Sequence, residues 1–284
     1  MTASGSNFLN TLDHSRTSAG LTYVYPVISR RAGGVSVGIN LNTNNACNWA
    51  CVYCQVPDLA RGGPLPVDLA LLEQELRSFL NVAVNGDFMA QQVPPEARQL
   101  MDIAFSGNGE PTSASEFLAA VDIAVQILSE FGLLESMKIR LITNGSLLQR
   151  QEVQDGIRRI GELHGEVWFK LDSATTEGMR RINGINLAPE AVLKNLEKCS
   201  GLAPTWLQTC FFSMDGKTPD EAEQQAYLEL VAQVKNRIRG VHLYGLARQS
   251  MQQDAQRLAP ACAETLAAFA AAIESQGVEV RIAV

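Results

Sequence analysis

The chain has 284 residues, of which 46% are hydrophobic and 19% are charged, and its net charge is −7. This composition is typical of a globular protein with a sizeable core, and it excludes a disordered chain. The negative charge argues against a long basic surface for nucleic acid, although a substrate of the size of a tRNA stays open. No apolar run approaches the roughly 20 residues of a membrane span, and the polar N-terminus lacks the apolar centre of a signal peptide. We therefore expect a cytoplasmic protein with no membrane partner.

The N-terminal region predicts a tail followed by a β-hairpin. Residues 1–18 are rich in Ser, Thr and Asn, which favours a loosely ordered segment. Residues 22–29 and 35–41 are rich in β-branched and aromatic side chains, and the glycine-containing turn between them suits a hairpin. We expect its two arginines, Arg30 and Arg31, to lie on the solvated surface. These patterns predict a tail and first hairpin strand over 1–34 and one main domain over 35–284.

Three cysteines follow the second hairpin strand at a spacing that is typical of a metal centre. Cys47, Cys51 and Cys54 stand at i, i+4 and i+7, so a coiled loop would bring their sulfurs to one face. Closed structural zinc sites and simple iron–sulfur sites use four protein ligands, so three cysteines leave one metal position open. A zinc half-site or an accidental cluster of thiols is the alternative at this point. The other three cysteines, at positions 199, 210 and 262, are scattered along the chain. This arrangement favours free thiols in a reducing compartment over disulfide bonds.

The rest of the chain alternates strands with helices. After an amphipathic helix over 67–84 and a connection over 85–99, strands are predicted at 102–106, 138–142, 166–171, 206–212 and 241–246. Helices are predicted at about 115–131, 188–199, 219–234 and 260–275, and one more helix follows the turn at 143–145 and ends at 160. A last strand is predicted at 278–283. Such alternation predicts parallel pairing with right-handed crossovers. The fold class is therefore α/β, a partial (β/α)6 TIM-type barrel with an N-terminal β-hairpin and a C-terminal helix–strand extension.

Polar residues follow the predicted strands, at the rim where α/β barrels place their active sites. Gly107-Asn108-Gly109-Glu110 ends one strand, and its glycines would let the backbone approach a ligand closely while the carboxylate accepts from an ammonium group. Asn144 ends the next strand, and Lys170, Asp172 and Ser173 end the one after it. Ordinary turn chemistry is the alternative for the glycine–asparagine turns.

Cys-x3-Cys-x2-Cys, with an aromatic residue before the third cysteine, resembles the signature of the radical S-adenosylmethionine (radical SAM) superfamily. In that family the three thiolates hold a [4Fe-4S] cluster, and the amino and carboxylate groups of SAM chelate the fourth iron. An electron from the reduced cluster then cleaves SAM to methionine and a 5′-deoxyadenosyl radical. The resemblance implies that Cys47, Cys51 and Cys54 are metal ligands.

The same resemblance implies roles for the polar strand ends. Gly107–Glu110 resembles the Gly-Gly-Glu motif that binds the SAM amino group, with Asn108 replacing the first glycine. Asn144, Asp172 and Ser173 would contact the ribose, and Lys170 a carboxylate. Tyr53 would lie beside the adenine, or its ring would pack against the cysteine loop. Cys210 and Tyr244 are candidates for hydrogen-atom donors.

The resemblance covers about residues 36–250 and is nearest to the iron–sulfur oxidoreductase group related to wyosine-forming tRNA-modifying enzymes. It implies an enzyme that cleaves SAM reductively and abstracts hydrogen from an unidentified small molecule or tRNA base. A flavodoxin or ferredoxin would supply the electron. The alternatives are an activase that makes a glycyl radical on a partner protein, and a non-catalytic iron–sulfur protein for electron transfer.

Overall fold

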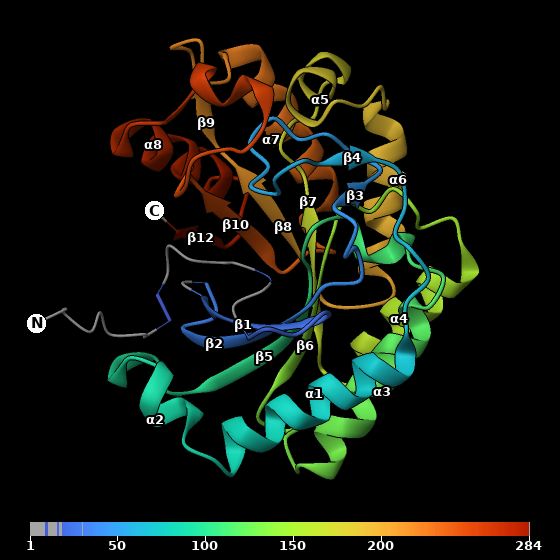
Figure 1. The fold of residues 1–284 in the computed structure, drawn as a ribbon. Helices are drawn as coiled ribbons and strands as arrows, with labels where there is room; N and C mark the ends of the chain where they lie inside the picture. Colours follow the sequence, from blue (N-terminus) through green and yellow to red (C-terminus); the bar gives the residue numbers. More distant parts are fainter. Residues whose placement is uncertain (1–8, 11–15, 17–18, 30, 284) are drawn as a thin grey trace, which may run out of the picture.

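The computed structural model describes residues 9–10, 16, 19–29 and 31–283, and its centre is one curved sheet of eight strands (Figure 1). The strands lie in the order β1-β2-β5-β6-β7-β8-β10-β12, and only the β1–β2 pair is antiparallel. Their bounds are β1 (Val24–Ser29), β2 (Gly34–Ile39), β5 (Leu100–Phe105), β6 (Lys138–Thr143), β7 (Glu166–Lys170), β8 (Thr205–Cys210), β10 (Gly240–Tyr244) and β12 (Val280–Ala283). The predicted hairpin and the parallel order of the strands are confirmed.

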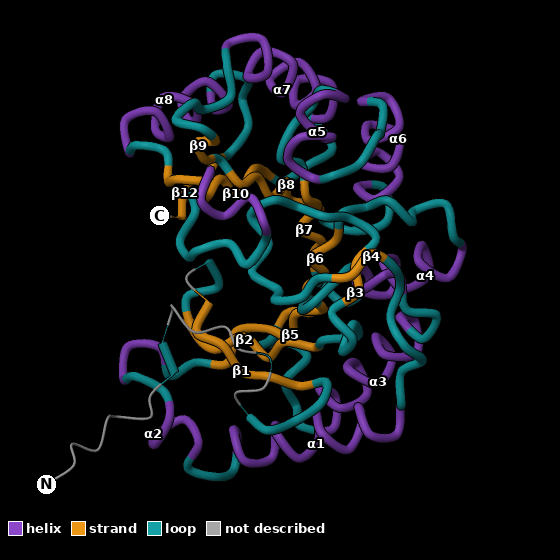
Figure 2. The backbone as a smooth tube through the Cα atoms, turned by 45° about the horizontal axis from the view of Figure 1, so that its top comes forward, coloured by secondary structure: helices purple, strands orange, loops and turns teal. Residues whose placement is uncertain are grey.

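Helices lie on the outer face of this sheet, and its inner face borders the lumen (Figure 2). Each main helix follows one parallel strand, which gives the six predicted strand–helix units. Their bounds are α1 (Leu69–Val84), α3 (Phe117–Glu130), α4 (Gln151–Glu162), α6 (Pro189–Ser200), α7 (Glu221–Val234) and α8 (Ala263–Glu274). The α/β class, the partial (β/α)6 barrel and its C-terminal helix–strand extension are therefore confirmed.

The strands alternate between an apolar outer face and a polar inner face, because successive side chains of a strand point to opposite sides of the sheet. In β10, Val241 and Leu243 are fully buried in the core between sheet and helices. His242 and Tyr244 point the other way. The same alternation gives the lumen a set of polar and aromatic side chains, namely Ser36, Asp102, Arg140, Trp168, Lys170, Gln208, Cys210 and Tyr244. The outer face of the sheet therefore packs against the helices in an apolar core, whereas the inner face presents polar and aromatic side chains to the lumen.

Several short elements differ from the prediction. Residues 85–99 were expected to be a connection, but they form α2 (Phe88–Gln92) and a 3₁₀ turn, η1 (Pro95–Ala97). Phe88 is buried against Phe79 of α1, so packing orders a segment whose local sequence is rich in turn residues. Two two-stranded ribbons are also new: β3 (Ala46–Cys47) with β4 (Ala60–Arg61), and β9 (Phe212–Met214) with β11 (Leu258–Pro260). The remaining 3₁₀ turns are η2 (Pro111–Ser113) and η3 (Gln253–Arg257).

A further helix, α5 (Thr176–Asn183), lies between β7 and α6 and was not predicted. Its ends follow ordinary capping rules, because the Thr175 hydroxyl accepts from the Gly178 amide and Gly184 takes a left-handed conformation with φ of 65° at the C-cap. The helix has only eight residues, which is too short for a clear apolar period in the sequence.

The predicted loosely ordered tail over 1–18 lies almost wholly outside the described residues, as does Arg30. The division of the chain at residue 34 stays a prediction. Within the described part of the chain, no helix is both long enough and apolar enough to span a bilayer.

Candidate active site

One cavity of about 290 Å³ runs from the carboxyl ends of the strands into the lumen. The three cysteines of the motif line it together with most of the polar strand ends that the sequence singled out. Those residues are Cys47, Cys51, Tyr53, Cys54, Gly107, Asn108, Gly109, Glu110, Asn144, Lys170, Cys210 and Tyr244. The fold therefore brings residues from five strands to one site.

The cysteine loop, residues 46–55, is fixed by backbone contacts to α5. The Ala50 and Val52 amides donate to the carbonyls of Asn183 and Ile182, at 3.0 and 2.8 Å. The Arg61 guanidinium bridges two carbonyls, that of Asn48 at 2.5 Å and that of Gly184 at 2.6 Å. These bonds hold the loop in a set shape before any ligand is bound.

A second support for the cysteine loop comes from the segment after β10. The Ser250 hydroxyl donates to the Val52 carbonyl at 2.6 Å, and the Gln252 side-chain amide donates to the Val56 carbonyl at 2.8 Å. The sequence showed no sign of either contact, because some 200 residues separate the partners.

The three thiols are free and half-buried, and hydrogen-bond donors point at two of them. The Asn183 side-chain amide donates to Cys51 Sγ at 3.3 Å, and the Trp49 amide donates to Cys47 Sγ at 3.5 Å. Burial raises the pKa of the Cys51 thiol to about 12, so the protein alone keeps it protonated. Such donors stabilise a thiolate once a metal has displaced the proton.

Within the described residues, no three His, Cys, Asp or Glu side chains are placed to ligate one metal ion. The three cysteines nevertheless line one cavity, in a loop that is held rigidly from both sides. In a [4Fe-4S] cluster each thiolate binds a different iron. Three cysteine thiols that line one cavity are a donor set that fits such a cluster.

Glu110 is the best-anchored carboxylate of the site. Its Oε1 accepts from the Thr112 amide at 3.1 Å and from the hydroxyls of Thr112 and Thr143, each at 2.6 Å, and its Oε2 accepts from the Asn144 amide at 2.7 Å. The side chain is buried, and this desolvation raises the pKa of the carboxyl in spite of those four bonds. A buried carboxylate with lone pairs left on Oε2 is a fitting partner for an ammonium group.

The two glycines before Glu110 are required by close packing. A Cβ on Gly109 would collide with the Ala46 carbonyl oxygen and lie 2.6 Å from the Asn42 side chain. Gly107 has a φ of +141°, and a Cβ there would lie 2.7 Å from Cγ of Asn40. The glycine turn is thus pressed against the start of the cysteine loop, which agrees with the close approach expected from the sequence.

Two asparagines tie the strand ends to the cysteine loop. The Asn144 side-chain amide donates to Asn48 Oδ1 at 2.8 Å, and the Asn108 side-chain amide donates to Asn45 Oδ1 at 2.7 Å. Both residues line the cavity, so an amide at position 108, where the resemblance expects glycine, has a structural use.

Asp172 and Ser173 are placed differently from the other expected ribose contacts. They line a second, much smaller cavity of about 20 Å³. Asp172 accepts from the Tyr53 hydroxyl at 2.5 Å, the Asn183 side-chain amide at 2.8 Å and the Cys210 amide at 3.0 Å. The structure thus shows this carboxylate bracing the cysteine loop, and its contact with a ribose stays a prediction.

Lys170 lies beside the cysteine loop with its Nζ 4.8 Å from the centre of the Tyr53 ring. Burial alone would lower the pKa of this lysine, but the acidic groups around it, including Tyr244 and Asp172, outweigh burial and raise the pKa. Lys170 is therefore a fixed positive charge at the site. The Tyr53 ring packs edge-on against Phe212 of β9, with the ring centres 5.7 Å apart, and its place beside the adenine stays a prediction.

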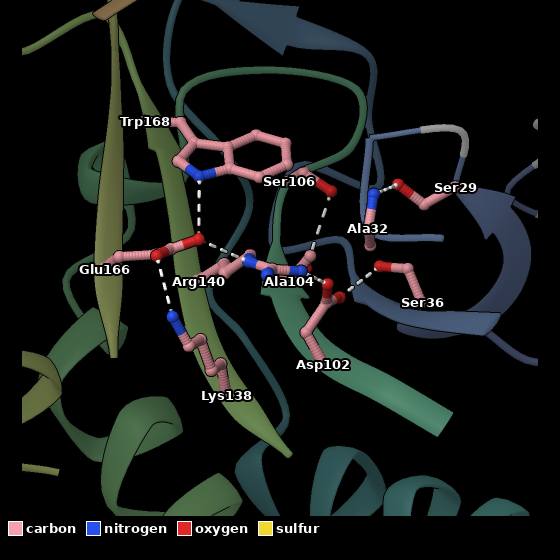
Figure 3. A network of polar contacts seen from close by, with 10 residues as sticks. All are labelled: Ser29, Ala32, Ser36, Asp102, Ala104, Ser106, Lys138, Arg140, Glu166 and Trp168. Carbon is pink, nitrogen blue, oxygen red and sulfur yellow. Dashed lines mark hydrogen bonds and ion pairs between the residues drawn. The ribbon is translucent and has the colours of Figure 1, made fainter. Parts of the chain in front are cut away.

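The lumen below the cysteines holds a network of charged residues that the sequence did not reveal (Figure 3). Arg140 contacts Asp102 with one nitrogen and donates through Nε to Glu166 at 2.7 Å. Ser36 also donates to Asp102, and Trp168 Nε1 donates to Glu166 at 3.1 Å. Ser36, Asp102 and Arg140 lie on three different strands, and Glu166 and Trp168 lie two positions apart on a fourth. Only the register of the sheet brings these side chains together.

Arg31, from the turn between β1 and β2, also lines the cavity, and its guanidinium carbon lies 5.1 Å from the centre of the Trp168 ring. The sequence suggested a solvated arginine here, and that expectation is wrong.

A comparison of the sequence with known protein families identifies the family of this chain. The profile of the Radical SAM superfamily matches residues 41–231, which is more than half of the chain and includes the cysteine loop, Glu110 and Lys170. The chain belongs to the radical SAM superfamily. This confirms the family that the cysteine spacing and the glycine–glutamate turn predicted.

Two curated relatives match part of this radical SAM chain. UPF0026 protein MJ1312 of Methanocaldococcus jannaschii is 30% identical over 163 residues, which is 56% of this chain and 42% of that protein. A GTPase Obg of Brachyspira hyodysenteriae is 24% identical over 132 residues, 46% of this chain and 17% of that protein. The chain thus spans less than half the length of either relative.

Solved structures share the fold at low sequence identity. A radical SAM methyltransferase from Sphaerobacter thermophilus is 14% identical with a TM-score of 0.63, over 92% of this chain and 68% of that one. TYW1 with a lysine-pyruvate adduct bound is 14% identical with a TM-score of 0.55, over 93% of this chain and 78% of that one. Both support the partial barrel.

Proposed function

We propose that the protein is a radical SAM enzyme in which Cys47, Cys51 and Cys54 hold a [4Fe-4S] cluster. When bound, the cluster supplies one electron that breaks a carbon–sulfur bond of SAM and yields methionine and a 5′-deoxyadenosyl radical. Such a radical would take a hydrogen atom from the substrate, which would give 5′-deoxyadenosine. The observation on which the proposal rests is the single cavity that unites three free thiols with Glu110 and Lys170.

The residues of the chain divide the binding of SAM between them. Glu110 would accept from the amino group, and Lys170 would neutralise the carboxylate. Asn144, Asp172 and Ser173 would contact the ribose, and Tyr53 would border the adenine. The glycine turn at 107–109 would leave room for the methionine half.

The electron would come from a protein donor such as a flavodoxin or ferredoxin. The cysteine loop has an exposed neighbour in residues 57–65, so a partner could approach the cluster from that side. Cys210 and Tyr244, which are register partners on β8 and β10 and both line the cavity, are the candidates for returning a hydrogen atom.

The test uses protein that is purified without oxygen and reconstituted with iron and sulfide. With dithionite and SAM, we expect about four irons per chain and the formation of 5′-deoxyadenosine and methionine. Cys51→Ala should lose both the product and the absorption of the cluster. Cys262→Ala removes an exposed thiol outside the cavity and is the matched control.

A reconstituted wild type that binds iron but forms no 5′-deoxyadenosine would contradict the proposal and favour the non-catalytic iron–sulfur alternative. Equal product from wild type and Cys51→Ala would show that the cysteine loop does not hold the reactive cluster. An activase of a glycyl radical would form 5′-deoxyadenosine in an amount equal to the partner protein that it modifies, which separates that alternative from turnover on a small molecule.

A further inference from the structure

The C-terminal end of α5 contains one buried asparagine that meets a cysteine of the proposed cluster. Asn183 is the last residue of α5 and is only 1% exposed. Its side-chain nitrogen Nδ2 lies 3.3 Å from Cys51 Sγ and 2.8 Å from Asp172 Oδ2. An amide nitrogen carries two hydrogen atoms, so it can serve both acceptors at once. The same side chain thus joins a thiol of the cysteine loop to a buried carboxylate.

Asp172 determines which end of the Asn183 amide faces the sulfur. A carboxylate only accepts hydrogen bonds, so the atom that meets Asp172 has to be the nitrogen and not the oxygen of the amide. Asp172 is itself fixed by the Tyr53 hydroxyl and the Cys210 amide, at 2.5 and 3.0 Å. The second N–H of Asn183 is therefore directed at Cys51.

The backbone at the end of α5 keeps this contact in place. The Asn183 carbonyl accepts from the amide of Ala50, the residue directly before Cys51, at 3.0 Å. Gly184 ends the helix with a φ of 65°, and a Cβ there would lie 3.0 Å from the Ala50 carbonyl oxygen. Asn183 thus holds the cysteine loop twice, through its backbone and through its side chain. The position of Nδ2 beside Sγ is set by the packing of α5 against the loop.

The donor to Cys51 differs in kind from the donor to Cys47. Cys47 Sγ accepts from the backbone amide of Trp49 at 3.5 Å, and that amide is present whatever the side chain at position 49. The donor to Cys51 belongs to a side chain that is 132 positions away in the sequence. One substitution removes it, so Asn183 is a residue through which the sequence sets a property of the metal centre.

A hydrogen bond to a thiolate ligand stabilises the more negative of two oxidation states. The N–H dipole lowers the energy of negative charge on the sulfur, and an electron added to an iron–sulfur centre increases that charge. The bond is strengthened here because Asn183 is buried away from water. Its removal should therefore make the reduced state harder to reach and lower the reduction potential.

We propose that Asn183 is a positioning residue whose amide raises the reduction potential of the cluster through Cys51, with Asp172 orienting that amide. The inference rests on the proposed function, because it takes Cys51 to be a ligand of the cluster. A higher potential makes transfer of one electron from a flavodoxin or ferredoxin easier, and no bond to Asn183 forms or breaks. Asn183 is not among the residues that line the cavity, so it acts through Cys51 and not on a substrate.

The test is a redox titration of the reconstituted protein without SAM, followed by the EPR signal of the reduced cluster. Asn183→Leu keeps the approximate size of the side chain and removes its two N–H groups. We expect the ratio of reduced to oxidised cluster at a fixed potential to fall by about tenfold, which is about 59 mV for one electron. Asn195→Leu is the matched control, because Asn195 is a buried asparagine of α6 that lines neither cavity. Its potential should equal that of the wild type.

Pulsed EPR tests the contact in the wild type, without any substitution. Protein made by cell-free synthesis, with asparagine labelled with ¹⁵N in its side-chain amide, should show coupling between that nitrogen and the reduced cluster. Asn183→Ser shortens the side chain but keeps the backbone carbonyl that accepts from Ala50. It should lose the coupling and lower the potential as Asn183→Leu does. Iron per chain shows whether each variant holds the cluster.

An unchanged or higher potential in the Asn183 variants, or the absence of ¹⁵N coupling in the wild type, would each overturn the inference. If neither variant holds the cluster, the labelled wild type decides. The proposed function is measured separately, by the 5′-deoxyadenosine that the wild type forms from SAM. A wild type that cleaves SAM, with variants that keep its potential, contradicts this inference and leaves the proposed function standing.

Discussion

Asp172 offers the sharpest test of the structure, because the family resemblance and the observed geometry predict different roles for this residue. The resemblance makes it a contact of the SAM ribose, which would matter only when SAM is bound. The structure shows it 7% exposed and accepting three hydrogen bonds, from Tyr53, Asn183 and the Cys210 amide. If these bonds brace the cysteine loop, the change Asp172→Asn should weaken the protein without any ligand.

The size of the effect follows from the number of acceptors. The amide of asparagine keeps one oxygen and turns an NH₂ group toward a donor, so one or two of the three bonds are lost. A hydrogen bond to a charged group contributes about 1.5–3 kcal/mol, so the loss of one or two bonds should lower the free energy of unfolding by about 1.5–6 kcal/mol. Asn183 also donates to Cys51, so loading of the cluster should slow in the same variant.

The assay is equilibrium unfolding of the metal-free protein in urea, followed by circular dichroism. Asp68→Asn is the matched control, because Asp68 caps α1 at the surface and asparagine caps a helix about as well. We expect that control to change the free energy of unfolding by less than about 0.5 kcal/mol. An Asp172→Asn variant that is as stable as the control, but binds SAM more weakly, would refute the bracing role and support the ribose contact.

Three further predictions concern the lumen and the glycine turn. Burial and then the charge of Arg31 lower the pKa of His242 from 6.5 to about 4, so its neutral form stabilises the fold above pH 6.5 and this contribution is lost as the pH falls toward 4. Stability should drop by about 2 kcal/mol more between about pH 7.5 and pH 5 in the wild type than in His242→Phe, measured by urea unfolding. Arg140→Met leaves the buried Asp102 without its cation and leaves Glu166 with Lys138 alone, and it should cost about 3–5 kcal/mol in the same assay. Arg158→Met at an exposed pair should cost less than about 1 kcal/mol. Gly109→Ala should lower the free energy of unfolding by about 1–3 kcal/mol and lower cluster loading, measured as iron per chain. Gly63→Ala, with open space around it, should change neither quantity. Equal effects within either matched pair of variants would contradict the packing described here.

The sequence predicted the strands and the main helices because their patterns are local. Val35-Ser36-Val37 already shows the alternation of a strand with one apolar face, and each strand is followed by a helix with an apolar stripe. The short helix α5 escaped because eight residues give no clear period, and α2 because its order depends on Phe88 meeting Phe79. Local patterns thus determine long elements, and packing determines short ones.

The residues that line the cavity divide in the same way. Cys47, Cys51 and Cys54 stand within eight positions of each other, so the sequence alone could predict a shared ligand. Arg31 and Trp168 are 137 positions apart, and nothing in either neighbourhood marks them as partners.

What the sequence by itself determined is therefore the family, the alternating architecture and the three cysteines, since all of these depend on residues that are near one another in the chain. Only the tertiary structure decided that Asp172 faces the cysteine loop and that Arg31 enters the lumen. The register between strands sets which side chains meet, and the register depends on the packing of the whole sheet against its helices. The chemistry of the lumen is a property of that register.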